Sequence, residues 1–439
     1  MQIKTDTISS FIKYKIELIR NSKFGTRVFS AVFWSMFGAV FQKVLLLLSS
    51  FICINILGKE DFGKLGIVRS TIQIFIILGA VGLGSTATKF IAEFRDDKDN
   101  SKLVTYYSTI KLLTIFSALI ATIVILLSGR RLALYLEDES LTVAIKIGAI
   151  LLFFSIITSI QTGVLAGLED FKHIAIVSIA GGMVEFLCII LGSYFWSVNG
   201  ALIGYGLGFL AITLLNEVFI YKNKTLKTDF FLLNKEDTKR ILIFSTPLLG
   251  SSLLVTPVLW YVQTMLVKAG SFEDLSVYTA ADQWKMVLLF IPSSLSRVIL
   301  PMLSNVLATD EQGDFKKILM INIKINAITT IIMFIIFLMA SPLIIHLYGF
   351  TTMEAFPTFA LLTGSTLFSC LATVAGQAIT SKSKTFIGLL FNLAWGIMIV
   401  FLSWLFLKLG MKSTAIALAT IISYFLHTVF QMVYLKLTI

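Results

Sequence analysis

Twelve apolar stretches, separated by short polar segments, dominate the pattern of this chain. Each is long enough to cross the hydrocarbon core of a bilayer, which takes ~20 predominantly apolar residues in a helix. We place the predicted spans near residues 28–57, 62–84, 103–128, 141–165, 174–196, 200–220, 241–267, 276–305, 318–348, 356–380, 385–407 and 413–435. The pattern predicts an all-α polytopic membrane protein.

The polar segments divide the chain into two halves of six spans each. The longest of these segments leave no room for a separate nucleotide-binding or catalytic domain. We predict an amphipathic cytoplasmic N-terminal segment at 1–27, a six-helix bundle at 28–220, a basic cytoplasmic linker at 221–240 and a second six-helix bundle at 241–439.

An internal repeat relates the two halves. Glu60-Asp61-Phe62-Gly63 follows the first span and aligns with Glu273-Asp274-Leu275-Ser276 after the seventh, at an offset of 213 residues. Since each half has six spans, both copies have the same membrane orientation, and the repeat is a parallel pseudo-twofold with its axis along the membrane normal. Two such bundles around a central cavity are typical of alternating-access carriers.

The composition supports the membrane class and excludes several functions. Hydrophobic residues make up 57% of the chain and charged residues 14%, against roughly 25% charged residues in soluble domains. Cys53, Cys188 and Cys370 all lie in predicted spans, so we interpret them as small core residues. Because the chain has neither an ATP-binding phosphate loop nor a recognisable catalytic spacing, we expect no enzyme, metal site or cofactor.

The formal net charge of +11 is explained mainly by the orientation of the chain in the membrane, rather than by a charged binding partner. If the N-terminus is cytoplasmic, 22 of the 36 Lys and Arg residues lie in cytoplasmic segments and seven on the opposite side. This asymmetry follows the positive-inside rule and places both termini in the cytoplasm. It predicts contact with anionic membrane lipids and no nucleic-acid partner.

Seven basic residues lie inside predicted spans. They are Lys43, Arg69, Lys111, Lys146, Lys285, Arg297 and Lys324. Only Glu185, Glu217 and Asp282 accompany them, which leaves a surplus of four positive charges. A charge within the bilayer costs about 3 kcal/mol or more, so it normally faces a protein interior or a watery cavity. The surplus predicts a cavity that suits an anion.

Depth within the spans ranks these charges. Lys43 lies near the middle of the first span beside Gln42, too deep to extend to water along the helix. Arg69 and Gln73 have the i, i+4 spacing that places them on one helix face, which we expect to line the cavity.

The eighth span carries a stripe of Asp282, Lys285 and Arg297. An alternative stays open, in which Asp282 and Lys285 only neutralise each other. We expect Lys111, Lys146 and Lys324, which lie near span ends, to extend to the membrane interface.

Short motifs along the chain resemble those of polysaccharide repeat-unit flippases of the O-antigen type. They are Ile56-Leu57-Gly58-Lys59-Glu60-Asp61-Phe62-Gly63-Lys64-Leu65, Gly82-Leu83-Gly84, Lys89-Phe90-Ile91-Ala92-Glu93-Phe94-Arg95, Gly163-Val164-Leu165-Ala166-Gly167-Leu168-Glu169-Asp170-Phe171, Phe244-Ser245-Thr246-Pro247-Leu248, Tyr278-Thr279-Ala280-Ala281, Ile291-Pro292, Leu300-Pro301-Met302-Leu303-Ser304 and Leu347-Tyr348-Gly349. The resemblance covers residues 56 to 349.

The resemblance implies a flippase of the multidrug/oligosaccharidyl-lipid/polysaccharide exporter superfamily in the bacterial inner membrane. Such a protein moves an undecaprenyl-diphosphate-linked oligosaccharide to the periplasmic leaflet, using a gradient of H⁺ or Na⁺. It also implies pathway partners, namely a polymerase and chain-length proteins. The charge pattern agrees independently, because a lipid-linked diphosphate is an anion that cannot cross ~30 Å of hydrocarbon unaided.

Further residues are candidates for sugar binding and ion coupling. The sugar would contact polar and aromatic side chains, for which the candidates are Gln42, Gln73, Gln161, Gln263, Asn326, Gln377, Asn392, Trp34, Trp260, Trp284 and Trp395. For each of them helix packing or an interfacial position is the alternative. Glu185, near the centre of the fifth span and without a basic neighbour at helical spacing, is the first candidate to carry the coupling ion, and Asp282 is the second. Glu217 lies near a span end, so we interpret it as interfacial.

Three other functions remain as alternatives. A multidrug exporter of the same superfamily would predict a cavity of net negative charge, and a membrane enzyme acting on lipid-linked sugars would predict a large polar loop. A flippase for the peptidoglycan precursor typically has fourteen spans. Gly200, Gly204 and Gly208, within a glycine-rich stretch of dinucleotide-loop type, lie inside a span and predict a close helix-packing face.

Overall fold

The computed structural model describes residues 23–96, 100–222, 226, 235–308, 312–382 and 384–438. In these ranges all regular secondary structure is α-helical, as predicted. The helices are α2 (Lys23–Ala80), α3 (Leu83–Phe94), α4 (Ser101–Tyr135), α5 (Leu141–Gly167), α6 (Phe171–Lys222), α7 (Lys235–Ala269), α8 (Phe272–Ala308), α9 (Gln312–Leu347), α10 (Thr352–Ser381), α11 (Thr385–Lys408) and α12 (Ser413–Thr438). Most of the predicted N-terminal segment 1–27 lies outside the described residues, so its amphipathic helix stays a prediction.

Two of these helices contain a reversal of the chain, which reconciles the helix count with twelve spans. Within α2 the backbone is non-helical at Gly58, with φ 80° and ψ 170°, a conformation that glycine adopts without a steric penalty. Within α6 it is non-helical at Trp196 and Ser197. Among the described residues, eight segments are long and apolar enough to cross a membrane, and two of them contain these reversals. Together with the more polar α7 and α8, they account for the twelve predicted spans.

The two arms of α6 pack tightly through glycine. A Cβ on Gly200 would lie 1.9 Å from the carbonyl oxygen of Gly192, one on Gly204 would lie 2.5 Å from the Cys188 backbone, and one on Gly208 would lie 2.5 Å from Cβ of Glu185. The predicted packing face of Gly200, Gly204 and Gly208 is therefore confirmed.

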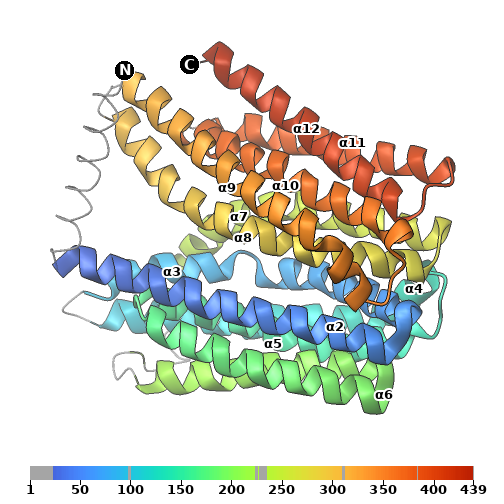
Figure 1. Cartoon of the computed structure of the whole chain (residues 1–439). Coiled ribbons are helices and arrows are strands. Elements are labelled where there is room, and N and C mark those ends of the chain that lie inside the picture. The colour runs from blue at the N-terminus through green and yellow to red at the C-terminus, as the bar shows by residue number, and fades with distance from the viewer. Residues whose placement is uncertain are drawn as a thin grey trace.

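Helices α2–α6 pack mainly against one another, and so do α7–α12. In Figure 1 the first group runs from blue to green and the second from yellow to red, and the two groups diverge toward the end at which α12 finishes. Contacts between the halves run mainly from α2 to α8 and α7. The exact domain boundaries stay a prediction.

Gly66 and Thr279 mark the pseudo-twofold axis. A Cβ on Gly66 would lie 2.6 Å from Oγ1 of Thr279, and Thr279 is the residue that the 213-residue offset pairs with Gly66. A residue that touches its own repeat equivalent lies on the axis relating the two copies. One turn earlier, a Cβ on Gly63 would lie 1.8 Å from the Phe272 carbonyl oxygen. The second arm of α2 thus crosses α8 through glycines, at the end predicted to be periplasmic.

Two motifs of the resemblance join α3 to α5 at the opposite end. A Cβ on Gly163 would lie 2.2 Å from the Gly84 carbonyl oxygen, and the Thr88 hydroxyl donates a hydrogen bond to the Gly163 carbonyl at 3.0 Å. Arg95 forms an ion pair with Glu169 at 2.7 Å. The bond to this carboxylate raises the pKa of the Arg95 guanidinium. The motifs after the second and fourth spans are therefore explained by helix packing.

Candidate functional site

A polar cluster lies inside the first half, built from three helical segments. Arg69, on the second arm of α2, donates a hydrogen bond from Nη1 to the Tyr205 hydroxyl at 2.8 Å, and its Cζ lies 4.0 Å from the centroid of that ring. Glu185, on the first arm of α6, is only 6% exposed. Its carboxylate lies within electrostatic reach of Arg69 and hydrogen-bonding reach of Gln42.

The structure thus brings together Arg69, Gln42 and Glu185, which the sequence nominates separately. Glu185 does have a basic neighbour, but that neighbour comes from another helix, which spacing within one helix cannot reveal. Tyr205 is a further member that sequence reasoning missed. Its only sequence signal is a position between Gly204 and Gly206, which indicates packing.

A comparable cluster lies inside the second half. Lys285 is 7% exposed and forms an ion pair with Asp282, one turn earlier on α8. Tyr278 of α8 and Tyr424 of α12 are further electrostatic neighbours of Lys285. The self-neutralising pair that the sequence left open is therefore present.

The two clusters correspond through the repeat. Arg69 lies in the second span and Lys285 in the eighth, which is its repeat equivalent, while Tyr205 and Tyr424 lie in the equivalent sixth and twelfth spans. Each half therefore holds a cation, a carboxylate and a tyrosine in its interior. Because an uncompensated charge there is costly, each cation has a carboxylate of its own half within electrostatic reach.

Lys43 lies at the boundary between the halves. It belongs to the first arm of α2, and its Nζ lies 5.5 Å from the centroid of the Phe290 ring on α8. The side chain is half-buried, and among the described residues it forms no ion pair. Lys43 therefore lies deep in a predicted span and close to both halves. Its ammonium group has no carboxylate partner among the described residues.

The predicted aromatic candidates lie in different places. The Trp260 indole N–H of α7 donates a hydrogen bond to Thr71 Oγ1 at 2.8 Å, and its ring stacks on Tyr135 with centroids 5.9 Å apart. These contacts join the halves. Trp34 is half-buried in α2 and meets Phe33 edge to face, with centroids 5.7 Å apart.

Gln73 and Arg297 are two further predicted binding residues. Gln73 is exposed, one turn beyond Arg69. Arg297 lies in a part of α8 for which the structure describes the backbone alone. Its role therefore stays a prediction.

The remaining embedded charges divide into one paired and two exposed groups. Lys111 of α4 contacts Glu217 of α6, whose other oxygen accepts a hydrogen bond from Gln161 Nε2 of α5 at 2.9 Å. A carboxylate on another helix therefore holds the Lys111 ammonium group, and its extension to the interface stays a prediction. Lys146 and Lys324 are exposed.

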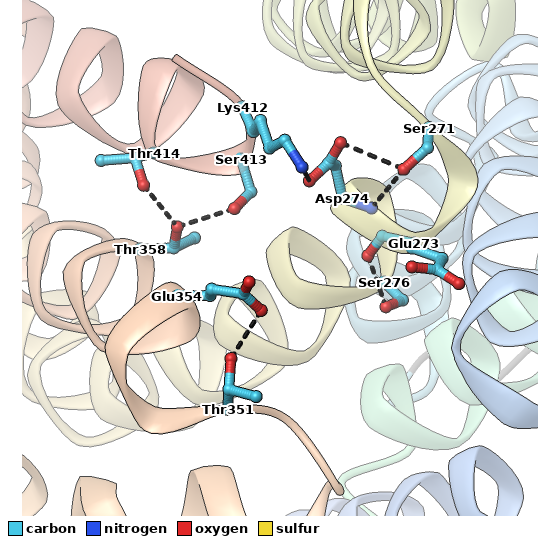
Figure 2. Close-up of polar contacts among 10 residues, drawn as sticks. All are labelled: Ser271, Glu273, Asp274, Ser276, Thr351, Glu354, Thr358, Lys412, Ser413 and Thr414. Carbon is cyan, nitrogen blue, oxygen red and sulfur yellow. Dashed lines mark hydrogen bonds and ion pairs between the residues drawn. The ribbon is translucent and has the colours of Figure 1, made fainter.

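Figure 2 shows polar residues at the beginnings of α8, α10 and α12. The Ser271 hydroxyl donates to Asp274 Oδ2 at 3.0 Å, and the Asp274 backbone N–H donates to Ser271 Oγ at 3.1 Å. Thr351 donates to Glu354 at 2.5 Å, and Lys412 lies 3.9 Å from Asp274. The bond from the Asp274 N–H to Ser271 caps the start of α8. Thr351 makes no such bond to the backbone of α10, so we assign its contact with Glu354, and that of Lys412 with Asp274, to packing.

The sequence matches a family model described as polysaccharide biosynthesis protein over residues 28–307. No curated protein matches the chain.

Solved structures of several transporters share the fold. An inward-facing multidrug resistance MATE family transporter of the MOP superfamily is 14% identical, with a TM-score of 0.82 over 92% of this chain and 98% of its own. An outward-facing transporter described in the same terms is 15% identical, with a TM-score of 0.70 over 96% and 97%.

A MOP superfamily transporter from Pyrococcus furiosus, with a binding pocket of reversed polarity that suggests a different function, is 14% identical. Its TM-score is 0.71 over 96% of this chain and 97% of its own. At these identities the likeness concerns the fold alone, and the higher score belongs to an inward-facing structure. The chain belongs to the polysaccharide biosynthesis protein family, and its fold is similar to that of MOP superfamily transporters.

Proposed function

We propose that this transporter is a flippase that moves an undecaprenyl-diphosphate-linked oligosaccharide from the cytoplasmic to the periplasmic leaflet of the bacterial inner membrane. Membership of a polysaccharide biosynthesis family supports a sugar-bearing cargo. The observation that carries the proposal is the position of Lys43, a half-buried cation deep in the membrane, between the two halves and without an ion-pair partner among the described residues. A cation held there is costly unless it serves an anionic ligand.

In the proposed mechanism the diphosphate binds between the halves while the polyprenyl chain stays in lipid. Lys43 and Arg297 attract the diphosphate, and Arg69 and Lys285 join them when their carboxylate partners are neutralised. Gln42, Gln73, Trp34 and Trp260 provide hydrogen bonds and ring faces for the sugars. Alternating access then exposes the same site to either side of the membrane.

Glu185 supplies the proposed coupling to an ion gradient. Its carboxylate lies near Arg69, so binding of H⁺ or Na⁺ by Glu185 would weaken their attraction and release Arg69 for the diphosphate. Asp282 stands in the same relation to Lys285. Ion binding and anion binding would then be linked within each half.

A multidrug exporter is the second candidate, since solved multidrug transporters share the fold. That function predicts a cavity rich in free carboxylates. Glu217 and Asp282 each form an ion pair with a lysine, and Glu185 lies within electrostatic reach of Arg69, which favours the anionic cargo.

Substitution of Lys43 tests the proposal. We expect Lys43→Gln to reduce complementation of a flippase-deficient strain about tenfold or more, because a charge-assisted contact to the diphosphate is lost. Lys43→Arg should retain activity. Lys146→Gln is the matched control, because Lys146 is an exposed basic residue within a span. Normal activity of Lys43→Gln at normal membrane levels would overturn the assignment of Lys43.

A further inference from the structure

A basic pocket lies between α3 and α7, apart from the clusters described above. Its volume is about 720 Å³, and its cations are Lys89 of α3 with Lys239 and Arg240 of α7. The rings of Phe90 and Phe244 form its apolar wall. The pocket therefore combines positive charge with aromatic surface.

Lys89 provides a cation that no carboxylate neutralises. Its Nζ lies 4.0 Å from the Phe244 ring centroid and 4.9 Å from that of Phe90. Among the described residues it forms no ion pair. The two rings hold the ammonium group in place by cation–π attraction, which leaves its hydrogen-bond donors available to an anion.

Arg240 has a different role, because it is already engaged. It donates hydrogen bonds to Glu93 Oε1 at 2.7 Å and to the Tyr106 hydroxyl at 3.2 Å. These bonds raise the pKa of the guanidinium and fix the start of α7 against α3 and α4. Glu236 also lines the pocket, but it is engaged in a contact of its own.

The pocket lies at the face predicted to be cytoplasmic, where we expect the lipid headgroups. Lys89 is close to the end of α3, and Lys239 is close to the beginning of α7, so both are at the face predicted to be cytoplasmic. The next residues of α7 present apolar side chains outward: Leu242 is 41% exposed and Ile243 is 63% exposed. Basic residues just outside an apolar helix face are typical of contacts with anionic lipid.

We propose that this pocket binds a phosphate group anchored in the cytoplasmic leaflet, either of an anionic phospholipid or of a polyprenyl diphosphate. Lys89 and Lys239 bind the phosphate oxygens, and Phe244 and Ile243 contact the apolar part next to them. Because Lys89 belongs to the first half and Lys239 to the second, a bound phosphate connects the halves at this end. The proposal does not depend on the assignment of Lys43, since Lys43 does not line this pocket.

Lipid binding to the full chain tests the proposal. The chain is reconstituted in phosphatidylcholine nanodiscs that contain either phosphatidylglycerol or undecaprenyl diphosphate, and lipid retention is measured by native mass spectrometry. We expect Lys89→Gln with Lys239→Gln to weaken retention about tenfold or more, since each basic residue near the surface contributes to anionic lipid attraction. The Lys89→Arg variant keeps the positive charge, so it should preserve much of the lipid retention.

Lys316→Gln with Lys317→Gln is the matched control, because these two lysines are exposed at the same face on α9. Selective loss of phosphatidylglycerol would identify a phospholipid site, and selective loss of undecaprenyl diphosphate would identify a carrier site. Loss of both would indicate a general phosphate site. If the Lys89/Lys239 variant retained both lipids as well as the control does, the proposal would be overturned.

Discussion

Arg69 and Glu185 show how charged residues are accommodated inside a helix bundle. Glu185 is buried and Arg69 is half-buried, and each offsets part of the desolvation cost of the other. The hydrogen bond from Arg69 to Tyr205 adds a fixed polar partner at 2.8 Å. The same reasoning applies to Asp282 and Lys285 on α8. Fewer embedded basic residues are therefore left without a carboxylate neighbour than the sequence indicates.

A double-mutant cycle tests the coupling of Arg69 to Glu185. Arg69→Gln and Glu185→Gln should each lower stability, by about 3 kcal/mol where one buried partner is left uncompensated. The double variant should be more stable than the sum of the two losses predicts, since no unpaired charge remains. Thermal unfolding in detergent measures the three variants, and strictly additive losses would contradict a coupled pair.

The limits of sequence reasoning also lie at the scale of residues. Spacing within one helix gave the Asp282–Lys285 pair as an alternative, because residues three apart share a helix face. It could not give Arg69 with Tyr205, or Lys111 with Glu217, because those partners are 136 and 106 residues apart. Contacts of this kind depend on which helices pack together.

At the scale of elements, glycine determines how closely the helices approach. Hydropathy predicted the spans, and four-residue spacing predicted the packing face of α6. The crossing of α2 and α8 at Gly63 and Gly66 was not predicted, because a single glycine in each helical turn has no distinctive pattern. The reversal at Trp196 and Ser197 was predicted, because it falls at the break between the predicted spans 174–196 and 200–220.

Gly63→Ala should disturb the crossing of α2 and α8. The new Cβ would lie 1.8 Å from the Phe272 carbonyl oxygen, and backbone cannot rotate away as a side chain can. We expect a loss of about 2 kcal/mol in the described conformation, as in other overpacked sites. Gly388→Ala is the control, since a Cβ there meets nothing within 4 Å. A thermal shift assay in which Gly63→Ala unfolds no earlier than the control would contradict this close crossing.

At the scale of the whole molecule, the fold relates two bundles that meet at one end. The higher TM-score to an inward-facing transporter, 0.82 against 0.70 to an outward-facing one, agrees with closure at the end predicted to be periplasmic. The contacts that close this end include Gly63 and Gly66 against α8. Alternating access would require these contacts to break in every cycle.

A reversible crosslink on the pseudo-twofold axis tests that requirement. A Cβ on Gly66 would lie 3.4 Å from Cβ of Thr279, close to the 3.5–4.5 Å that a disulfide spans. With Cys53, Cys188 and Cys370 replaced by Ala, Gly66→Cys with Thr279→Cys should form a disulfide under oxidation.

Oxidation should abolish complementation or transport by the double variant, and a reductant should restore it, because the crosslink holds the two halves together. Each single cysteine variant serves as a control that oxidation should leave unaffected. Quantitative crosslinking, measured by mass spectrometry, together with undiminished transport would show that the halves do not separate along this seam. In that case the substrate would have to cross without the rocking motion that the two-bundle architecture implies.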